Sequence, residues 1–94
     1  MRPIHPGEIL REEYLVPKGM SANALAIALR VPAPRINDVV RKKRGVSIDT
    51  SLRLARYFRT TPQFWMNLQT AYDLKVAEME EGEQIKRDIT PCAS

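Results

Sequence analysis

Apolar residues recur at every third or fourth position along most of the chain, the spacing that places them on one face of a helix. Proline, glycine and short polar stretches divide this pattern into five segments, and none of them alternates apolar and polar residues as a half-buried strand does. The pattern predicts an all-α domain, with helices over residues 6–15, 21–30, 33–42, 49–58 and about 62–79.

The residues at the segment ends support these limits. Ser21, Asp49 and Thr61 have side chains that can accept a hydrogen bond from the first turn of a helix, so we expect each to be an N-cap. Pro17 and Gly19 are expected to end the first helix, because both residue types interrupt helices. The polar stretch 81–94 is expected to be a mobile tail, following a domain of residues 1–80.

The second and third segments have the apolar spacing of a helix-turn-helix. Two short helices that cross steeply share a small core, which requires apolar residues at particular offsets. Arg30 stands where the turn usually has glycine, and a left-handed backbone there costs a residue with a side chain about 1 kcal/mol or more. The expected core positions are Leu25, Leu29, Val31, Ile36 and Val39.

The outward side of the third helix has side chains that suit the major groove of DNA. Arg35 and Arg41 could donate paired hydrogen bonds to guanine, and Asn37 could pair with adenine. Asp38 would repel phosphate, so we expect it either to face a cytosine amino group or to orient an arginine. Small apolar residues at the helix start could pack on thymine methyl groups. The predicted base-reading residues are Ala33, Pro34, Arg35, Asn37, Asp38 and Arg41.

Charge is distributed unevenly along the 94 residues, whose net charge is +4. Residues 1–60 have 12 basic and 5 acidic residues, whereas residues 61–94 have 3 basic and 6 acidic ones. The run Arg41-Lys42-Lys43-Arg44 follows the third helix directly and is suited to phosphate. A basic run alone is more often a solvated surface, but together with the helix-turn-helix spacing it favours DNA binding.

The fifth segment is apolar on two sides. Positions 65, 68, 72, 76 and 79 share one face, and positions 64, 71 and 74 lie on another. Because a surface helix needs only one apolar stripe, the second side predicts self-association; the alternative is that the first helix covers both sides. The predicted homodimer interface consists of Phe64, Trp65, Leu68, Tyr72 and Val76.

Other classes of protein find little support in the composition. His5 and Cys92 lie at opposite ends of the chain, too few ligands for a structural zinc site, so neither a metal nor a cofactor is expected. No positioned acid or base is apparent, which argues against an enzyme such as a small nuclease. No apolar run is long enough to cross a membrane, the N-terminus lacks an apolar signal region, and a single cysteine suits the reducing cytoplasm.

Five stretches of the chain also occur in a familiar order. They are HPGEIL at 5–10, VPAPRIN at 31–37, KRGVSIDT at 43–50, LRLARYF at 52–58 and FWMNLQ at 64–69. Together they closely resemble the HigA-type antitoxins, members of the Xre-like helix-turn-helix group, over residues 3–78. Where that family often has Asn-Gly after the third helix, this chain has Arg41-Lys42.

The resemblance implies a lambda-repressor-like fold and a function that the residues alone do not. Such antitoxins neutralise a HigB toxin, a ribosome-dependent, mRNA-cleaving endoribonuclease of RelE-like fold. Their dimers repress their own operon at an inverted repeat. By this resemblance residues 33–41 would read bases, and Ser21 and Asn23 would contact phosphate at a helix N-terminus. The alternative is a stand-alone Xre-type regulator without a toxin.

Overall fold

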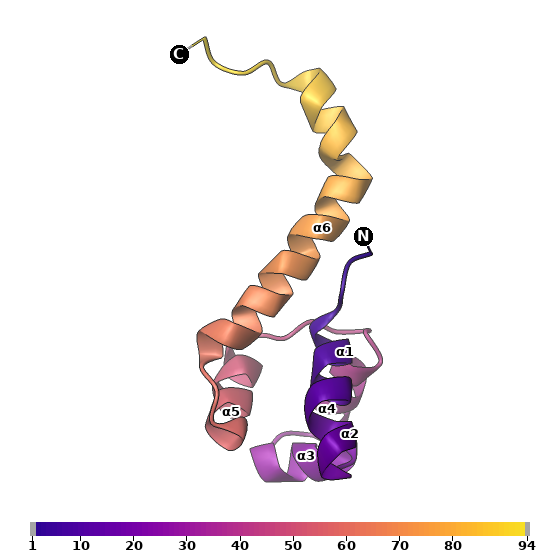
Figure 1. Cartoon of the computed structure of the whole chain (residues 1–94), viewed down its shortest axis with the longest axis vertical. Coiled ribbons are helices and arrows are strands. Elements are labelled where there is room, and N and C mark those ends of the chain that lie inside the picture. Colours follow the sequence, from indigo (N-terminus) through magenta and orange to yellow (C-terminus); the bar gives the residue numbers. More distant parts are fainter. Residues whose placement is uncertain (1, 94) are drawn as a thin grey trace.

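The computed structural model describes residues 2–93, which form five helical segments and no strand (Figure 1). This confirms the predicted all-α fold. The first segment is continuous and consists of α1 (Pro6–Ile9), η1 (Leu10–Leu15) and α2 (Val16–Lys18). The others are α3 (Ala22–Leu29), α4 (Ala33–Val40), α5 (Ile48–Phe58) and α6 (Pro62–Asp88).

The first segment ends later than predicted. Pro17 does not stop it: a wider turn precedes the proline, in which the Val16 N–H donates to the Arg11 carbonyl five residues back. Gly19 ends the helix instead, with a left-handed φ of 60°. Glycine adopts this conformation without steric cost, which makes it a frequent helix terminator.

The first segment, α3, α4, α5 and the start of α6 pack together into the body of the domain, and one apolar core lies where they meet. It contains four of the predicted helix-turn-helix positions, while Val31 is half-buried at its edge. Burying one leucine or isoleucine side chain stabilises a fold by roughly 1.5–3 kcal/mol, so these few residues supply much of the stability of a domain this small. Fully buried side chains come from every helical segment and include Leu10, Leu25, Ile36, Leu54 and Trp65.

The turn of the helix-turn-helix has a left-handed backbone at Arg30, the conformation that costs free energy for a residue with a side chain. Arg30 caps α3 with a left-handed φ of 59°. Its N–H donates to the Ile27 carbonyl at 3.1 Å, and the Val31 N–H donates to the Ala26 carbonyl at 3.0 Å. These bonds end α3 and turn the chain into α4.

The start of α5 differs from the prediction. Ser47 is the N-cap, and its hydroxyl accepts from the Thr50 N–H at 3.2 Å. Asp49, expected in this position, lies in the first turn instead, where its charge favours the positive end of the helix dipole. Serine and aspartate both cap helices well, and because Ser47 and Asp49 lie two residues apart, the sequence alone does not decide between them.

The start of the first segment packs tightly on the end of α4. A Cβ atom at Gly7 would lie 1.9 Å from the Val39 carbonyl oxygen, an impossible contact, so glycine is required there. This close approach fixes the C-terminal end of α4 against the rest of the body.

Helix α6 continues beyond the body and is longer than predicted (Figure 1). It ends at Asp88, not near Met79, so residues 81–88 belong to a helix and not to an irregular tail. Gly82 lies within it. Its last turns extend away from the other helices, and the described chain reaches 53 Å in its longest dimension but only 23 Å across. No helix among residues 2–93 combines the length and apolar character needed to cross a membrane.

Candidate nucleic-acid interface

Helix α4 presents most of its predicted base-reading residues on one open surface. Ala33, Pro34, Asn37, Asp38 and Arg41 line a shallow hollow of about 380 Å³, together with one residue of α3. Ala33, Pro34 and Arg41 are exposed, whereas Asn37 and Asp38 are half-buried. Ile36 and Val39, on the opposite side of the helix, are fully buried. The polar side of α4 therefore faces outward, as the sequence predicts.

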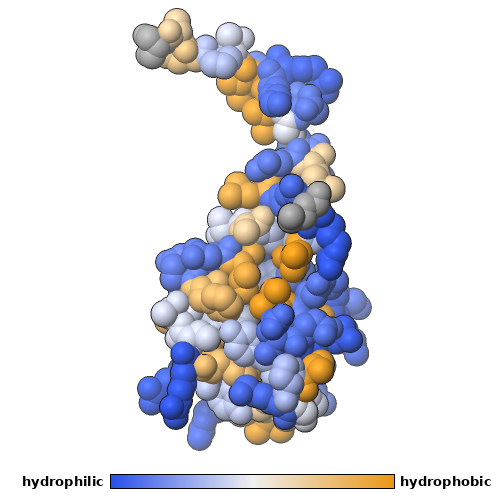
Figure 2. All heavy atoms as spheres, viewed as in Figure 1, coloured by the Kyte–Doolittle hydropathy of each residue, from blue (hydrophilic) through white to orange (hydrophobic). Residues whose placement is uncertain are grey.

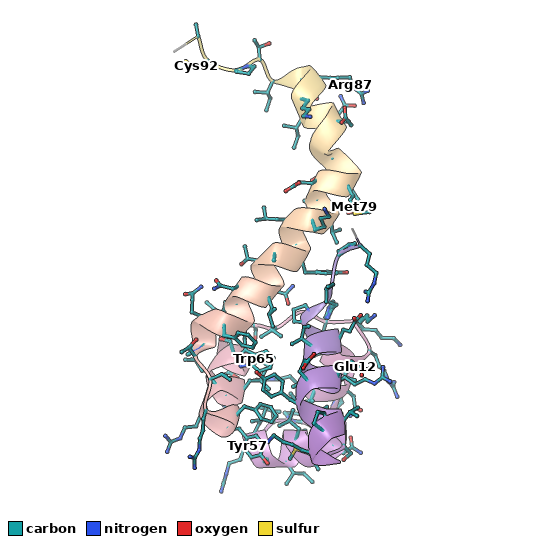
Figure 3. All side chains as sticks on the ribbon, viewed as in Figure 1. Glu12, Tyr57, Trp65, Met79, Arg87 and Cys92 are labelled. Atoms are coloured by element: carbon teal, nitrogen blue, oxygen red, sulfur yellow. The ribbon has the colours of Figure 1, made fainter. Side chains whose placement is uncertain are left out.

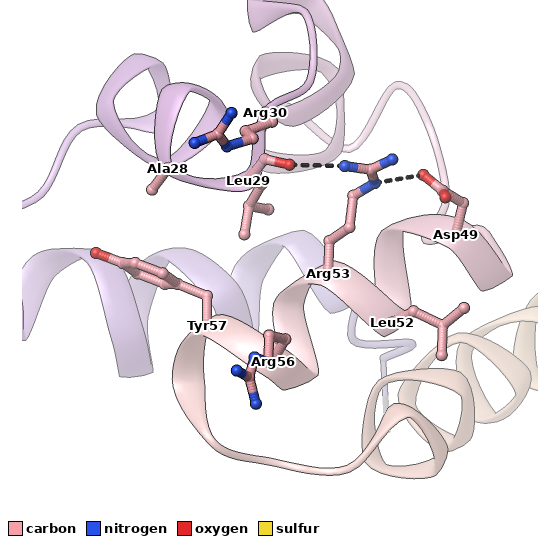
Figure 4. Close-up of a pocket in the computed structure, with 8 residues that line it drawn as sticks. All are labelled: Ala28, Leu29, Arg30, Asp49, Leu52, Arg53, Arg56 and Tyr57. Carbon is pink, nitrogen blue, oxygen red and sulfur yellow. Dashed lines mark hydrogen bonds and ion pairs between the residues drawn. The ribbon is translucent and has the colours of Figure 1, made fainter.

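Arg35 is placed differently from the other predicted base readers. Its guanidinium forms an ion pair with Asp49 at the start of α5. The same carboxylate accepts from Arg53 Nε at 2.9 Å, and Arg53 also donates to the Leu29 carbonyl at 2.9 Å (Figure 4). The hydrogen bonds from Arg53 and Arg35 lower the pKa of Asp49. Asp49 thus ties α4 and α5 together, and Arg35 does not line the hollow.

Asn37 is bonded to a residue of the preceding helix. Its Nδ2 donates to Asn23 Oδ1 at 2.7 Å and to the Ala33 carbonyl at 3.0 Å. Asn23, predicted to contact phosphate, therefore lies beside the base-reading face and lines the same hollow. The sequence held no signal for this pairing, because the two residues are 14 positions apart on different helices.

Asp38 pairs with an arginine, the second of the two roles predicted for it. Its carboxylate lies 3.7 Å from Arg44 Nη2. Its carbonyl also accepts from the Lys43 N–H at 2.8 Å and from the Arg44 N–H at 3.2 Å. The carbonyl at the end of α4 is satisfied in this way, and the chain that follows is held close to the helix.

The basic cluster, residues 41–44, is exposed directly after α4. Lys42 has a left-handed φ of 65°, and its ammonium group lies 3.2 Å from Glu8 Oε1. Glu8 also pairs with Arg2 at 2.7 Å. Hydrogen bonds from Arg2 and from Lys42 lower the pKa of Glu8 to about 2. Glu8 therefore remains negative at neutral pH and holds the Lys42 side chain toward α1, whereas no ion pair holds Lys43 within residues 2–93.

Ser21 caps α3, as predicted. Its hydroxyl accepts from the Ala24 N–H at 3.0 Å, and the residue is exposed. The N-terminus of α3 is thus open to solvent close to the face of α4, a position where backbone N–H groups can bind an anion.

One of the five residues predicted for the dimer interface belongs to the core. Trp65 has no exposed surface, points into the body (Figure 3) and donates from Nε1 to Thr60 at 2.8 Å. It therefore drops out of that surface. Phe64 is 37% exposed and lies 6.5 Å, ring to ring, from Tyr14, so the first segment covers part of the second apolar side. The remaining three, Leu68, Tyr72 and Val76, are half-buried.

The far part of α6 has apolar residues without cover in the protomer. Leu74 is 57% exposed and Met79 is 66% exposed. In Figure 2, apolar patches lie among polar residues along this helix beyond the body. The structure thus leaves unburied part of the apolar surface that led to the prediction of self-association.

His5 is buried, although it lies only five residues from the start of the chain. Its Nδ1 accepts from the Gly7 N–H at 2.9 Å, which makes it the N-cap of α1, and its ring lies 4.8 Å from that of Tyr72 on α6. Burial lowers the pKa of His5, the positive charge of Lys42 lowers it further, and Asp73 opposes both. His5 has a structural role, joining the first segment to α6.

Acidic, histidine and cysteine side chains do not gather into a group of three or more that could hold a metal ion in residues 2–93. Cys92 is exposed beyond the end of α6. The hollow on α4 is lined by the amides of Asn23 and Asn37 and by the positive charge of Arg41.

The fold and this surface together define a helix-turn-helix protein. A family model described as helix-turn-helix matches residues 10–65. The Pseudomonas aeruginosa antitoxin HigA, solved with the higBA promoter, is 56% identical, with a TM-score of 0.95 over 96% of this chain and 98% of that one. The chain belongs to the helix-turn-helix family and, within it, to the HigA-type antitoxins.

Two further proteins show how far the likeness extends. The crystal structure of PA4674 with its 18-bp operator DNA, also from Pseudomonas aeruginosa, is 54% identical, with a TM-score of 0.96 over 100% of this chain and 99% of that one. Virulence-associated protein I of Dichelobacter nodosus is 62% identical over 81 residues, which are 86% of this chain and 75% of that protein. The resemblance stated from the sequence is thereby confirmed.

Proposed function

We propose that this chain is an antitoxin of the cytoplasm that binds operator DNA as a homodimer and neutralises a HigB-like toxin. The observation that carries the DNA-binding part is the outward polar face of α4, which is followed directly by four basic residues. A single helix fits the major groove, and positive charge at its end can neutralise phosphates and fix its position.

The related structures support a DNA partner. Two proteins more than half identical to this chain were solved with an operator or promoter, and this chain matches them over nearly its whole length. Base contacts would come from the residues of α4 and Arg41 that line the hollow, and phosphate contacts from Ser21, Asn23 and residues 42–44. Arg35 would reach DNA only through rotation away from Asp49.

Selection of duplexes from a random library tests this part. We expect the chain to enrich an inverted repeat whose half-sites lie about 34 Å apart, one turn of DNA. Binding of the enriched duplex, measured by fluorescence anisotropy, should exceed that of a scrambled duplex by roughly 10³-fold or more. Equal affinity for both duplexes would contradict sequence-specific binding.

The homodimer is supported by the apolar residues of α6 that the protomer leaves uncovered. Burial of Phe64, Leu74 and Met79 against a second copy would remove them from water, and a two-fold dimer would match a two-fold operator. Sedimentation at low micromolar concentration should give the mass of a dimer, and a Phe64→Asp variant should shift it toward monomer. A wild-type chain that sediments as a monomer would contradict this part.

Toxin neutralisation is supported by family membership and by the charge of the C-terminal third. Residues 61–94 have 3 basic and 6 acidic residues, and an enzyme that grips RNA is expected to be basic. Co-expression with the product of the adjacent reading frame should yield a stable complex of the two chains. Separate elution of the two would favour a second candidate, the stand-alone Xre-type regulator, because the DNA-binding surface lies in residues 21–44 and needs no toxin.

A further inference from the structure

The hydrogen bonds of Asn37 decide which of its atoms are available to a base. Its amide nitrogen has two hydrogens, and both are used: one donates to the Ala33 carbonyl at 3.0 Å and one to Asn23 Oδ1 at 2.7 Å. A carbonyl can only accept, so the atom of Asn37 that faces Ala33 must be the nitrogen. The oxygen Oδ1 is therefore the atom of Asn37 left to face a ligand.

Asn23 has the reverse arrangement, in which the oxygen is bonded and the nitrogen is left. Its oxygen accepts from Asn37, so its Nδ2 points elsewhere, and that nitrogen donates no hydrogen bond to another group of residues 2–93. Asn23 is exposed and lines the same hollow as Asn37. The two amides together present one acceptor, from Asn37, and one donor, from Asn23.

The major-groove edge of adenine carries the matching pair. N7 is an acceptor and the N6 amino group is a donor, and one asparagine usually satisfies both. Asn37 cannot do so here without giving up one of its two existing bonds, because both of its amide hydrogens are already donated. Guanine presents acceptors at both N7 and O6, so the oxygen of Asn37 would face another acceptor.

We infer that Asn23 and Asn37 act as one adenine reader, in which Asn23 Nδ2 donates to N7 and Asn37 Oδ1 accepts from the N6 amino group. Asn23 is then a specificity-determining residue and not only a phosphate contact. This inference rests on the proposed function, since it assigns an operator base to the surface proposed to bind DNA.

Base analogues test the assignment atom by atom. The probe is the duplex that the wild-type chain enriches from a random library, with each adenine replaced in turn by 7-deazaadenine, which lacks the N7 acceptor, or by purine, which lacks the N6 amino group. At one adenine, each analogue should weaken wild-type binding on the order of tenfold. Asn23→Ala should abolish the effect of 7-deazaadenine and retain that of purine. Asn37→Ala should abolish both, because Asn23 also loses its support.

Two control variants separate the possible outcomes. Lys43→Ala should weaken all duplexes equally and leave both analogue effects intact, and Gln84→Ala, which removes an exposed amide far along α6, should change nothing. An Asn23→Ala chain that loses affinity equally for all duplexes, or keeps its full response to 7-deazaadenine at every adenine, would overturn the inference and leave the proposed function standing. A wild-type chain that enriches no sequence would refute the proposed function itself.

Discussion

The face of α4 and the far part of α6 expose side chains of opposite character. The face of α4 is polar, yet its side chains are held by neighbours: Asn37 by Asn23, and Arg35 by Asp49. The far part of α6 has exposed apolar residues, Met79 and Ile85 among them. In Figure 3 the ribbon of α6 runs on beyond Met79 with no other helix beside it. A surface prepared for hydrogen bonding is ordered in advance, which lowers the entropic cost of binding. The apolar residues of the far part of α6, by contrast, gain stability only when a partner chain buries them.

The first prediction compares the stability contributed by the core with that contributed by the far part of α6. Trp65→Ala should lower the free energy of unfolding by about 3–5 kcal/mol, because it empties the centre of the core. Met79→Ala, in the same helix but 66% exposed, should change it by less than about 0.5 kcal/mol in the monomer. Urea unfolding of both variants measures this. Similar losses for the two would show that the far part of α6 is packed in the isolated protomer.

The second prediction concerns the charges at either end. Lys43→Ala should weaken binding to every duplex by a similar factor. It should also reduce the slope of log Kd against log salt concentration by about 0.9 for each phosphate that the lysine neutralises in the wild-type chain. Lys86→Ala removes the same charge from the far part of α6 and should leave both quantities unchanged. Anisotropy titrations across salt concentrations compare them, and an equal effect of the two variants would mean that charge position is irrelevant.

The helix-turn-helix could be predicted from sequence because its signals are local. Apolar offsets at Leu25, Leu29, Ile36 and Val39 place those residues inside, and the polar face of α4 follows from the same periodicity. The length of α6 could not be predicted in this way, because residues 80–88 have no apolar stripe. Five of these nine residues are nevertheless Glu, Gln or Lys, which favour a helix even where no apolar stripe is present.

The arrangement of the site was harder to predict than its position. The bond of Asn23 to Asn37 and the ion pair of Arg35 with Asp49 each join residues 14 positions apart on different helices. His5 likewise meets Tyr72 only through the fold. Such contacts depend on how the helices cross and on side-chain rotamers, and neither can be predicted from the spacing of apolar residues in the sequence.

The third prediction tests whether Asp49 restrains the basic surface. Asp49→Ala removes a negative charge and releases Arg35 from its ion pair, while Arg53 keeps its bond to the Leu29 carbonyl. Affinity for a scrambled duplex should therefore rise a few-fold while preference for the enriched duplex falls. The cost in stability should stay below about 1 kcal/mol, because both ion pairs are exposed. Anisotropy with the two duplexes and a thermal melt provide the measurements. Unchanged binding of the scrambled duplex would indicate that Asp49 only links α4 to α5.

The fourth prediction is a weak pH dependence of stability that arises at His5. The fold keeps this imidazole neutral and lowers its pKa below 6.5, so the unfolded chain binds more protons in that range. The contribution is fully present above pH 6.5 and is lost as the pH falls through the lower pKa of the folded state. The urea midpoint should therefore fall between pH 7.5 and pH 5.5. His5→Asn keeps a capping oxygen but does not titrate, so its midpoint should change less over that range.

We expect α4 to enter the major groove of the operator and α6 to stay clear of the DNA. Amide chemical shifts of the full chain, recorded as the enriched duplex is added, test it most directly. The largest changes are expected at Ser21, Asn23 and residues 33–44, with residues 80–88 unmoved. Changes concentrated in α6, with residues 33–44 unaffected, would show that α4 is not the DNA-binding helix.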